Sequence, residues 1–387
     1  MLLICLFVKA HHIALRTLER NASFVSRYWP IQRATLVPDL TSDCRDLEPS
    51  RELCYNDKME TSIRLESVRR LFNDGNHNAF TDLCRFRGQL YLTFRNCPDG
   101  HMLFTSSRII VMRSADGQVW QQVFSFSVPH RDVRDPHFMV FNGRLFVYSG
   151  AWWVDPQDSH NRDINDHLGF CAWSDDGLAW HGPTLLNGTH GYYIWRAASH
   201  AGIAYLNGRR HRDFMVVADR RERDELMESW LMSSQDGFNW TPLGLMQPHG
   251  GDETAFVFED DGSILAVARG MAQRPAQVCR SRPPYTAWTR TNLDRHIGGP
   301  LLARWGTRYL VGGRKTIDKA RPVTTLYWLE GDALHEIMEL PSGGDNSYPG
   351  FVELSPTRGL LSYYSSHEGS GTSLAPCAIY LAELSLA

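Results

Sequence analysis

A short motif occurs three times in this sequence at a fixed interval of 60 residues. Its copies run from Ser114 to Trp120, from Ser174 to Trp180 and from Ser234 to Trp240, and each reads Ser-x-Asp-Gly-x-x-Trp. A repeat of this length is typical of units that stack or that surround an axis, rather than of one continuous wound sheet.

The chemistry of the motif is that of a tight turn. The Asp side chain can accept hydrogen bonds from nearby backbone N–H groups, and Gly tolerates a positive φ. Apolar residues precede the motif, as in Ile109 to Met112. Each copy therefore predicts the tip of a β-hairpin, with its Trp packing the following strand onto the unit.

A second series consists of a glycine followed by an aromatic or aliphatic strand. Its members begin at Gly88, Gly143, Gly202, Gly262, Gly306 and Gly359. Six such strands predict an all-β chain with six sheets of about four strands around one axis, a six-bladed β-propeller. The last strand, from Ala378 to Leu384, has no partner of its own, so we expect it to pair near Ile63 to Val68 and close the ring.

Composition excludes several classes of protein. The chain has 387 residues, of which 43% are hydrophobic, so it is neither disordered nor a small disulfide-stapled domain. Its 40 basic and 43 acidic residues give a net charge of −3. We therefore expect no nucleic-acid partner. The eight cysteines form no CxxC pair, which favours buried thiols over a disulfide framework.

The first part of the sequence does not match the repeat pattern. Residues 1–60 match it poorly and are predicted to form an N-terminal extension, whereas residues 61–387 form the propeller and catalytic domain. No run of about 18 apolar residues predicts a membrane span. Met1 to Ala10 lacks a basic start, so we favour a plain N-terminal segment over a signal peptide, which leaves cytoplasmic location and secretion by another route both open. Arg221 to Ser229 is the one helix-like stretch, or a polar loop.

The Ser-x-Asp-Gly-x-x-Trp copies resemble the Asp-box (BNR) repeat of the sialidase superfamily, with one residue deleted. The resemblance implies the propeller fold, but Asp-boxes lie away from active sites and say little about activity. A more specific resemblance lies in three segments of the C-terminal half: Gly251 to Arg269, Gly312 to Arg314, and Asn346 to Gly350.

In the sialidase family these segments carry the catalytic groups. The resemblance implies that Tyr348 is the nucleophile, that Glu253 is its base, and that Arg269 and Arg314 bind a substrate carboxylate. The first blade departs from the family, because the stretch from Asn76 to Leu83 lacks the first arginine of the carboxylate-binding triad. The following loop, Phe94 to His101, implies Asp99 or His101 as the acid–base residue.

A weaker resemblance is to propeller-fold polysaccharide lyases of the ulvan type and to related rhamnose-releasing enzymes. There, histidine and tyrosine act beside an arginine that neutralises a uronate. The residues of this chain that this second resemblance implies are His77, Arg95, His101, Arg196, His200 and Tyr205.

The residue types support these roles physically, and each has a structural alternative. Two guanidinium groups can clamp a planar carboxylate, although each could instead form an interblade ion pair. A phenol with a pKa near 10 needs a nearby base to attack, or else is an aromatic lining or core residue. Loop histidines titrate near neutral pH, but single ones are more often surface residues. Arg134 and Asp135 precede a strand and supply another acid, a substrate contact, or only an Asp-Pro turn.

The sequence therefore predicts a sialidase-like glycosidase that hydrolyses a terminal acidic sugar, sialic-acid-like or uronate-linked, from a glycan. No metal-binding spacing such as HExxH occurs, and we expect neither metal nor cofactor. Two alternatives stay open. One is a lyase that removes the C5 proton of a uronate with His77 or His101 as base and Tyr348 or Tyr205 as proton donor. The other is a glycan-binding propeller without catalysis.

Overall fold

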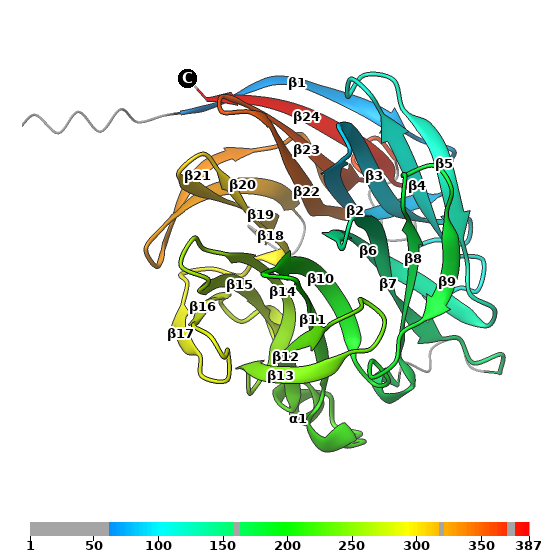
Figure 1. The fold of residues 1–387 in the computed structure, drawn as a ribbon, viewed down its shortest axis with the longest axis vertical. Helices are drawn as coiled ribbons and strands as arrows, with labels where there is room; N and C mark the ends of the chain where they lie inside the picture. The colour runs from blue at the N-terminus through cyan, green and yellow to red at the C-terminus, as the bar shows by residue number, and fades with distance from the viewer. Residues whose placement is uncertain (1–61, 158–162, 317–320, 370–375, 387) are drawn as a thin grey trace, which may run out of the picture. The chain divides into compact units, whose positions relative to one another are not determined.

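The structure, a computed structural model, describes residues 62–157, 163–316, 321–369 and 376–386 (Figure 1). The predicted N-terminal extension, residues 1–60, lies outside the described residues, so its boundary stays a prediction. The described chain forms six four-stranded antiparallel sheets around an axis, which confirms the predicted six-bladed propeller.

The first three sheets follow the chain in order, each built from consecutive strands. They are β2–β5 (His77–Phe86, Gln89–Cys97, Arg108–Ser114, Gln121–Phe126), β6–β9 (Arg131–Phe141, Arg144–Trp153, Leu168–Ser174, His181–Leu185) and β10–β13 (Tyr193–His200, Ile203–His211, Met227–Ser234, Thr241–Gln247).

Two further sheets continue this order and the last one closes the ring. They are β14–β17 (Gly251–Phe258, Ile264–Gly270, Gln277–Ser281, Thr289–Asn292), β18–β21 (Gly298–Trp305, Arg308–Thr316, Pro322–Glu330, Ala333–Glu339), and β22–β24 (Asn346–Ser355, Arg358–Ser365, Ala378–Leu386) with β1 (Ile63–Phe72).

Ring closure joins the two ends of the described chain. β1 pairs antiparallel with β24, with Val68 opposite Ala382, as the lone last strand predicts. This pairing gives the sixth sheet its outer strand from the start of the propeller, so β24 has no exposed edge.

The glycine series marks the turn into the second strand of the first five sheets. In the first three sheets this turn has two central residues with positive φ, such as Arg87 (48°) and Gly88 (75°). That geometry is a type I′ turn, whose twist matches that of the flanking strands. Gly359 differs, because it lies inside β23.

The three motif copies form the turns between third and fourth strands. In the copy around Asp236, the Oδ1 atom accepts the N–H groups of Phe238 and Asn239 at 2.8 Å each. The hydroxyl of Ser234 accepts the N–H of Gly237 at 2.9 Å. The Trp of this copy, Trp240, is buried against the neighbouring sheet, where its ring lies 5.6 Å from that of Tyr148.

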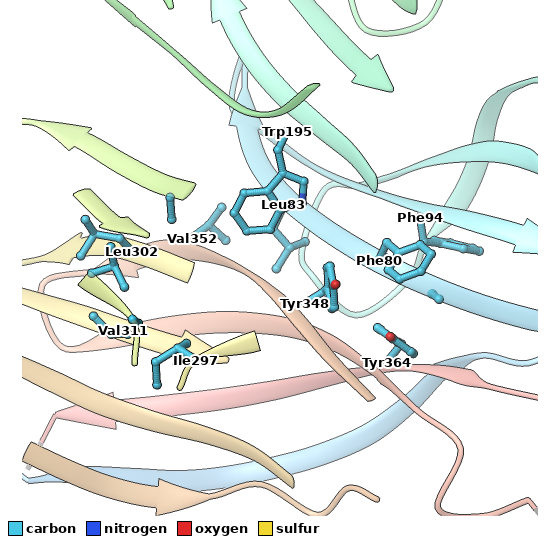
Figure 2. Close-up of a cluster of buried hydrophobic side chains, with 14 of the residues drawn as sticks. Phe80, Leu83, Phe94, Trp195, Ile297, Leu302, Val311, Tyr348, Val352 and Tyr364 are labelled. Atoms are coloured by element: carbon cyan, nitrogen blue, oxygen red, sulfur yellow. The ribbon is translucent and has the colours of Figure 1, made fainter. Parts of the chain in front are cut away.

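The innermost strands, β2, β6, β10, β14, β18 and β22, each contact the next and form a closed inner ring. A cluster of buried apolar and aromatic side chains joins the strands of the ring; it includes Phe80, Trp195, Tyr348 and Tyr364 (Figure 2). Burial of this cluster holds the six sheets around a common centre.

Helical structure is sparse in the described chain. One α-helix, α1 (Arg220–Glu225), begins at the cap Asp219, and three single 3-10 turns (Ile164–Asp166, Arg212–Phe214, Met271–Gln273) occur in loops. The helix covers only the first part of the helix-like stretch, because Met227 already belongs to β12. In the described part no helix is long and apolar enough to cross a membrane.

Candidate functional site

Each innermost strand carries a bulge at the corresponding place. Two residues interrupt the ladder with the second strand: Phe80 and Thr81, Asp135 and Pro136, Trp195 and Arg196, Asp252 and Glu253, Gly299 and Pro300, and Tyr348 and Pro349. A bulge redirects a side chain that strict alternation would place elsewhere.

Several of these bulges hold residues in strained backbone conformations. Phe80 (φ 62°), Asp135 (50°) and Tyr348 (51°) all lie in the left-handed region, which non-glycine residues rarely adopt. Such strain is retained where the surroundings enforce it and is frequent at functional sites. Here the three strained side chains all line one pocket near the propeller axis.

This axial pocket has a volume of about 410 Å³. Besides the three residues with positive φ, its lining is dominated by charged side chains. These are Arg134, Arg209, Arg220, Asp224, Asp252, Glu253, Arg269 and Arg314, with His101 and Tyr193 beside them.

A hydrogen-bonded group forms the centre of the pocket. The hydroxyl of Tyr348 donates to Glu253 Oε1 at 2.8 Å, and Arg269 Nη1 donates to Glu253 Oε2 at 2.8 Å. Arg269 Nη1 also lies 3.3 Å from the Tyr348 hydroxyl. Glu253 and Arg269 come from β14 and β15 of one hairpin, whereas Tyr348 comes from β22.

The protonation states of this group follow from burial and charge. Burial and the charge of Glu253 raise the pKa of Tyr348, so the phenol is protonated at neutral pH. Burial would also raise the pKa of Glu253, but Arg269 and Arg209 outweigh it and lower that pKa to about 2. At rest the site therefore holds a neutral phenol against a carboxylate.

Asp252 and Arg209 extend this hydrogen-bonded group through ion pairs. Asp252 is buried and pairs with both Arg209 and Arg269, whose Nε is 3.2 Å from Asp252 Oδ2. The sequence interpretation missed Arg209, although a signal existed. It lies seven residues after a strand-starting glycine, Gly202, as Arg269 does after Gly262.

Arg314 is held by a second buried carboxylate. Its Nη2 lies 3.3 Å from Asp345 Oδ1 and donates to the carbonyl of Asn346 at 2.6 Å. The same nitrogen is 3.1 Å from the hydroxyl of Tyr364. Asp345, which the sequence interpretation also missed, thus positions Arg314 on one side of the pocket.

Asp135 is a buried carboxyl group that lines the same pocket as Glu253. Burial and the charge of Glu253 raise the pKa of Asp135 to about 7. Its Oδ2 accepts the hydroxyl of Tyr193, while its Oδ1 has no hydrogen-bond partner among the described residues. Asp135 is therefore a carboxylic acid that can carry a proton near neutral pH.

The first blade contributes an aromatic ring where the family resemblance implies an arginine. Phe80 is the pocket-lining residue of the stretch from Asn76 to Leu83. Its ring centroid lies 5.0 Å from that of Tyr348 and 5.5 Å from that of Tyr364 (Figure 2). The guanidinium of Arg134 lies 5.6 Å from the Phe80 ring. The part of the pocket lining formed by Phe80 is therefore apolar, with the positively charged Arg134 beside the ring.

Of the residues that the sequence singled out, the structure brings His101, Arg134, Asp135, Glu253, Arg269, Arg314 and Tyr348 into this one pocket. His77 lies behind it, buried and hydrogen-bonded to Asp345. Asp99 lies outside it on an exposed loop, where it accepts the hydroxyl of Ser106 at 2.5 Å.

Four predicted substrate contacts do not line the pocket. Arg95 is fully buried against Asp132, at 2.6 Å. Arg196 pairs with Asp82 at 2.7 Å. His200 stacks on Phe258 with ring centroids 4.5 Å apart, and Tyr205 packs in the same apolar cluster. Ion pairs with buried carboxylates therefore hold the two arginines, and packing against neighbouring aromatic side chains holds His200 and Tyr205.

One group of described residues has the spacing of metal ligands: His77, Asp345 and Cys377. Arg95 Nη1 lies 3.3 Å from His77 Nδ1, and because a guanidinium only donates, Nδ1 accepts. The ring proton is then on Nε2, which donates to Asp345 at 2.8 Å. A metal would need that nitrogen unprotonated, so the arrangement does not fit a metal ion.

Fold and pocket together define the class: a six-bladed propeller with a charged pocket at its axis. Many solved structures share the fold, including the following three. A protein of unknown function from Dyadobacter fermentans has a TM-score of 0.69 and 18% identity, covering 84% of this chain and all of that one. A Trypanosoma rangeli sialidase in complex with sialic acid has a TM-score of 0.59 and 13% identity, covering 83% of this chain.

A Hadza microbial sialidase is similar as well, with a TM-score of 0.58 and 15% identity over 79% of this chain and 65% of that one. The chain spans a little over half, 57%, of the trypanosome sialidase. At these identities the likeness shows a sialidase-like propeller fold alone. No protein-family model and no curated protein matches the sequence.

Gly299, in the bulge of β18, sets the space available to Tyr348. A Cβ atom at Gly299 would lie 2.5 Å from Tyr348 Cδ2, whereas one at Gly306 would meet no atom within 4 Å. Both glycines have similar φ, 61° and 59°. We expect Gly299→Ala to lower the free energy of unfolding by about 1–3 kcal/mol more than Gly306→Ala does. Equal losses in urea unfolding would contradict this packing.

Proposed function

We propose that this chain is a sialidase-like glycoside hydrolase that releases a terminal acidic sugar from a glycan. The observation that carries the proposal is the hydrogen-bonded group of Tyr348, Glu253 and Arg269 in the lining of the axial pocket. A phenol beside a carboxylate base is the arrangement that tyrosine nucleophiles require.

In this proposal Tyr348 attacks the anomeric carbon and Glu253 accepts the phenol proton. The transfer is uphill at rest, because the pKa of Tyr348 is raised and that of Glu253 is about 2. Proton transfer therefore accompanies formation of the bond to carbon, which makes the phenol acidic as the attack proceeds. Arg269, 3.3 Å from the hydroxyl, stabilises the charge that develops there.

The arginines support an acidic sugar. Arg269 and Arg314 line the pocket from neighbouring sheets, and Arg209 lines it between Arg269 and Asp135 in blade order. Guanidinium groups bind a carboxylate through paired N–H donors. In the first blade, Phe80 stands where the family resemblance implies a carboxylate-binding arginine. In this proposal the sugar carboxylate therefore lies toward Arg269 and Arg314, and an apolar face of the sugar packs on Phe80.

The test is a panel of 4-methylumbelliferyl glycosides of sialic acid, glucuronic acid and iduronic acid, with the neutral galactoside as reference. The proposal expects release of fluorophore from at least one acidic glycoside and none from the galactoside. Binding of the acidic sugars without any turnover would leave a glycan-binding propeller and overturn the hydrolase.

A lyase is the second candidate, because His101 and Tyr348 line the same pocket and could act as base and acid in β-elimination. Elimination leaves a conjugated double bond in the product. Incubation with uronate-containing polysaccharides, monitored by ultraviolet absorbance, therefore separates the two reactions. Growth of that absorbance, rather than release of a saturated sugar, would favour the lyase.

Asp135 predicts a pH dependence of stability. Its pKa is about 7 in the folded chain and about 3.9 when unfolded, so the folded state keeps a proton that the unfolded state loses. Ionisation of Asp135 therefore lowers the free energy of unfolding. This loss develops as the pH rises from about 4 to about 7 and is complete above pH 7.

We expect Asp135→Asn to be more stable than the wild type at pH 8, with a difference that shrinks as the pH falls from about 7 to about 4. Urea unfolding at a series of pH values measures it. The control is Asp175→Asn, because Asp175 is an exposed carboxylate that pairs with Arg144. A difference that does not change over this range would show that Asp135 is ionised in the folded protein.

A further inference from the structure

His101 connects the pocket to a buried carboxylate. Its side chain is 27% exposed and lines the pocket, while its Nδ1 lies 2.6 Å from Asp345 Oδ2. The same oxygen accepts His77 Nε2 at 2.8 Å, and the other oxygen accepts the hydroxyl of Tyr364 at 2.9 Å. Asp345 thus lies at the centre of a network of donors.

The network fixes which ring nitrogen of His101 carries a proton. Burial would raise the pKa of Asp345, but hydrogen bonds from His101 and His77 and the charge of Arg314 hold it well below its usual range. An ionised carboxylate only accepts hydrogen bonds. His101 Nδ1 is therefore protonated and donates to Asp345, which leaves Nε2 as the nitrogen available for exchange with the pocket.

The backbone of His101 is held in place as well. Arg134 Nη2 donates to the carbonyl of His101 at 2.9 Å and to that of Met102 at 3.1 Å. Arg134 is itself buried and paired with Asp132 at 2.9 Å. Both ends of His101 are thus anchored to buried groups, as the positioning of a proton-transfer residue requires.

We propose that His101 and Asp345 form the acid–base pair of this pocket, with His101 Nε2 as the atom that transfers the proton and Asp345 as the residue that orients the ring. The proposal rests on the hydrolysis proposed above and names its missing proton donor. Asp99, the other sequence candidate, is exposed and does not line the pocket.

The first step then balances as follows. Tyr348 Oη bonds to the anomeric carbon and its proton goes to Glu253, while the glycosidic C–O bond breaks and its electron pair takes the proton from Nε2 of the His101 imidazolium. In the second step, water oxygen bonds to the anomeric carbon and one water proton returns to Nε2. The bond to Tyr348 breaks, and the phenolate recovers its proton from Glu253.

Leaving-group dependence tests the catalytic part. For the acidic sugar that the wild type hydrolyses, we expect His101→Ala to lose about 10²–10⁴-fold in kcat/KM on the methyl glycoside. The loss on the 4-nitrophenyl glycoside should be much smaller, because nitrophenolate leaves without a proton. His181→Gln, on the exposed strand β9, is the matched control. Equal losses on both glycosides would overturn the proposal.

A measurement without substrate tests the geometry separately. In the full chain labelled with ¹⁵N-histidine, we expect neutral His101 to carry its proton on Nδ1 and His77 to carry its proton on Nε2. The signals are assigned by their loss in His101→Gln and His77→Gln. A neutral His101 whose one ring proton is on Nε2 would overturn the pair even if the glycosides are hydrolysed. If no glycoside is hydrolysed but the Nδ1–H form is found, the proposed hydrolysis fails and the pairing geometry stands.

Discussion

Replacing Tyr348 by phenylalanine is expected to lower kcat/KM on the hydrolysed acidic glycoside by about 10³-fold or more, because the ring stays and only the attacking oxygen is lost. The fold should survive, since the Tyr348 ring keeps its contacts with Phe80 and Trp195. Initial rates on the 4-methylumbelliferyl glycoside, with the melting temperature alongside, measure both effects.

Tyr363→Phe is the matched control. Its hydroxyl also donates one hydrogen bond, to the carbonyl of Pro341 at 2.9 Å, but the ring packs in an apolar cluster and does not line the pocket. We expect this change to cost about 1 kcal/mol of stability and no activity. A Tyr348→Phe variant as active as this control would rule out the tyrosine nucleophile.

Glu253→Gln separates the base from the nucleophile. The amide can still accept the hydrogen bond from Tyr348 but does not take up its proton, so a loss of about 10²–10⁴-fold is expected. If Glu253 served only to pair with Arg269, the activity of the variant would instead stay close to that of the wild type.

Asp132→Ala should give the largest loss of stability of any single change discussed. Asp132 is fully buried and accepts Arg95 Nη2 at 2.6 Å, Arg134 Nε at 2.9 Å and the N–H of Phe104 at 2.8 Å. Its removal leaves two buried guanidinium groups without their carboxylate. Breaking a buried pair in this way costs about 3–5 kcal/mol.

Urea unfolding at neutral pH measures this loss. Asp175→Ala removes the exposed partner of Arg144 and is expected to change the midpoint little, because solvent screens that pair. Since Arg95 and Arg134 also donate to backbone carbonyls of residues 100–102, Asp132→Ala should loosen the loop that carries His101. Similar midpoints for the two variants would contradict the assignment of Asp132 as the buried counter-ion.

Much of the fold was predictable because its signals are local. The Asp-Gly turns need only a short side chain and a residue that tolerates positive φ, so three copies at equal spacing define repeated hairpins. The unpaired strand from Ala378 and the strand near Ile63 both needed a partner, and pairing them closes the ring.

From spacing alone, only site residues that are close in sequence could be placed together, whereas Tyr348 and Arg314 were assigned through the family resemblance. Glu253 and Arg269 are 16 residues apart on one hairpin, so a single turn brings them to the same end of a sheet. Arg95 and Tyr205 show the limit of such reasoning. Both lie on second strands with suitable chemistry, but Asp132 and an apolar cluster from other strands take up their side chains.

Three of the six bulges contain a proline, Pro136, Pro300 or Pro349, a residue that strand interiors tolerate at bulges, whereas the other three carry no such signal. Alternation with a period of two predicts which face a strand residue occupies, and a two-residue interruption cancels that prediction at Phe80, Asp135 and Tyr348. Asp345 was missed for another reason. Its partner His77 is 268 residues away and meets it only because the last sheet lies beside the first.

The amino-acid sequence by itself determined the number of sheets, the hairpin turns and the closure of the ring, because turn chemistry acts between near neighbours and the first and last strands of the described chain had no other partner. The tertiary structure alone decided which charged groups are buried as pairs and which face the pocket. That choice depends on the bulges of six separate sheets and on carboxylates supplied from distant parts of the chain.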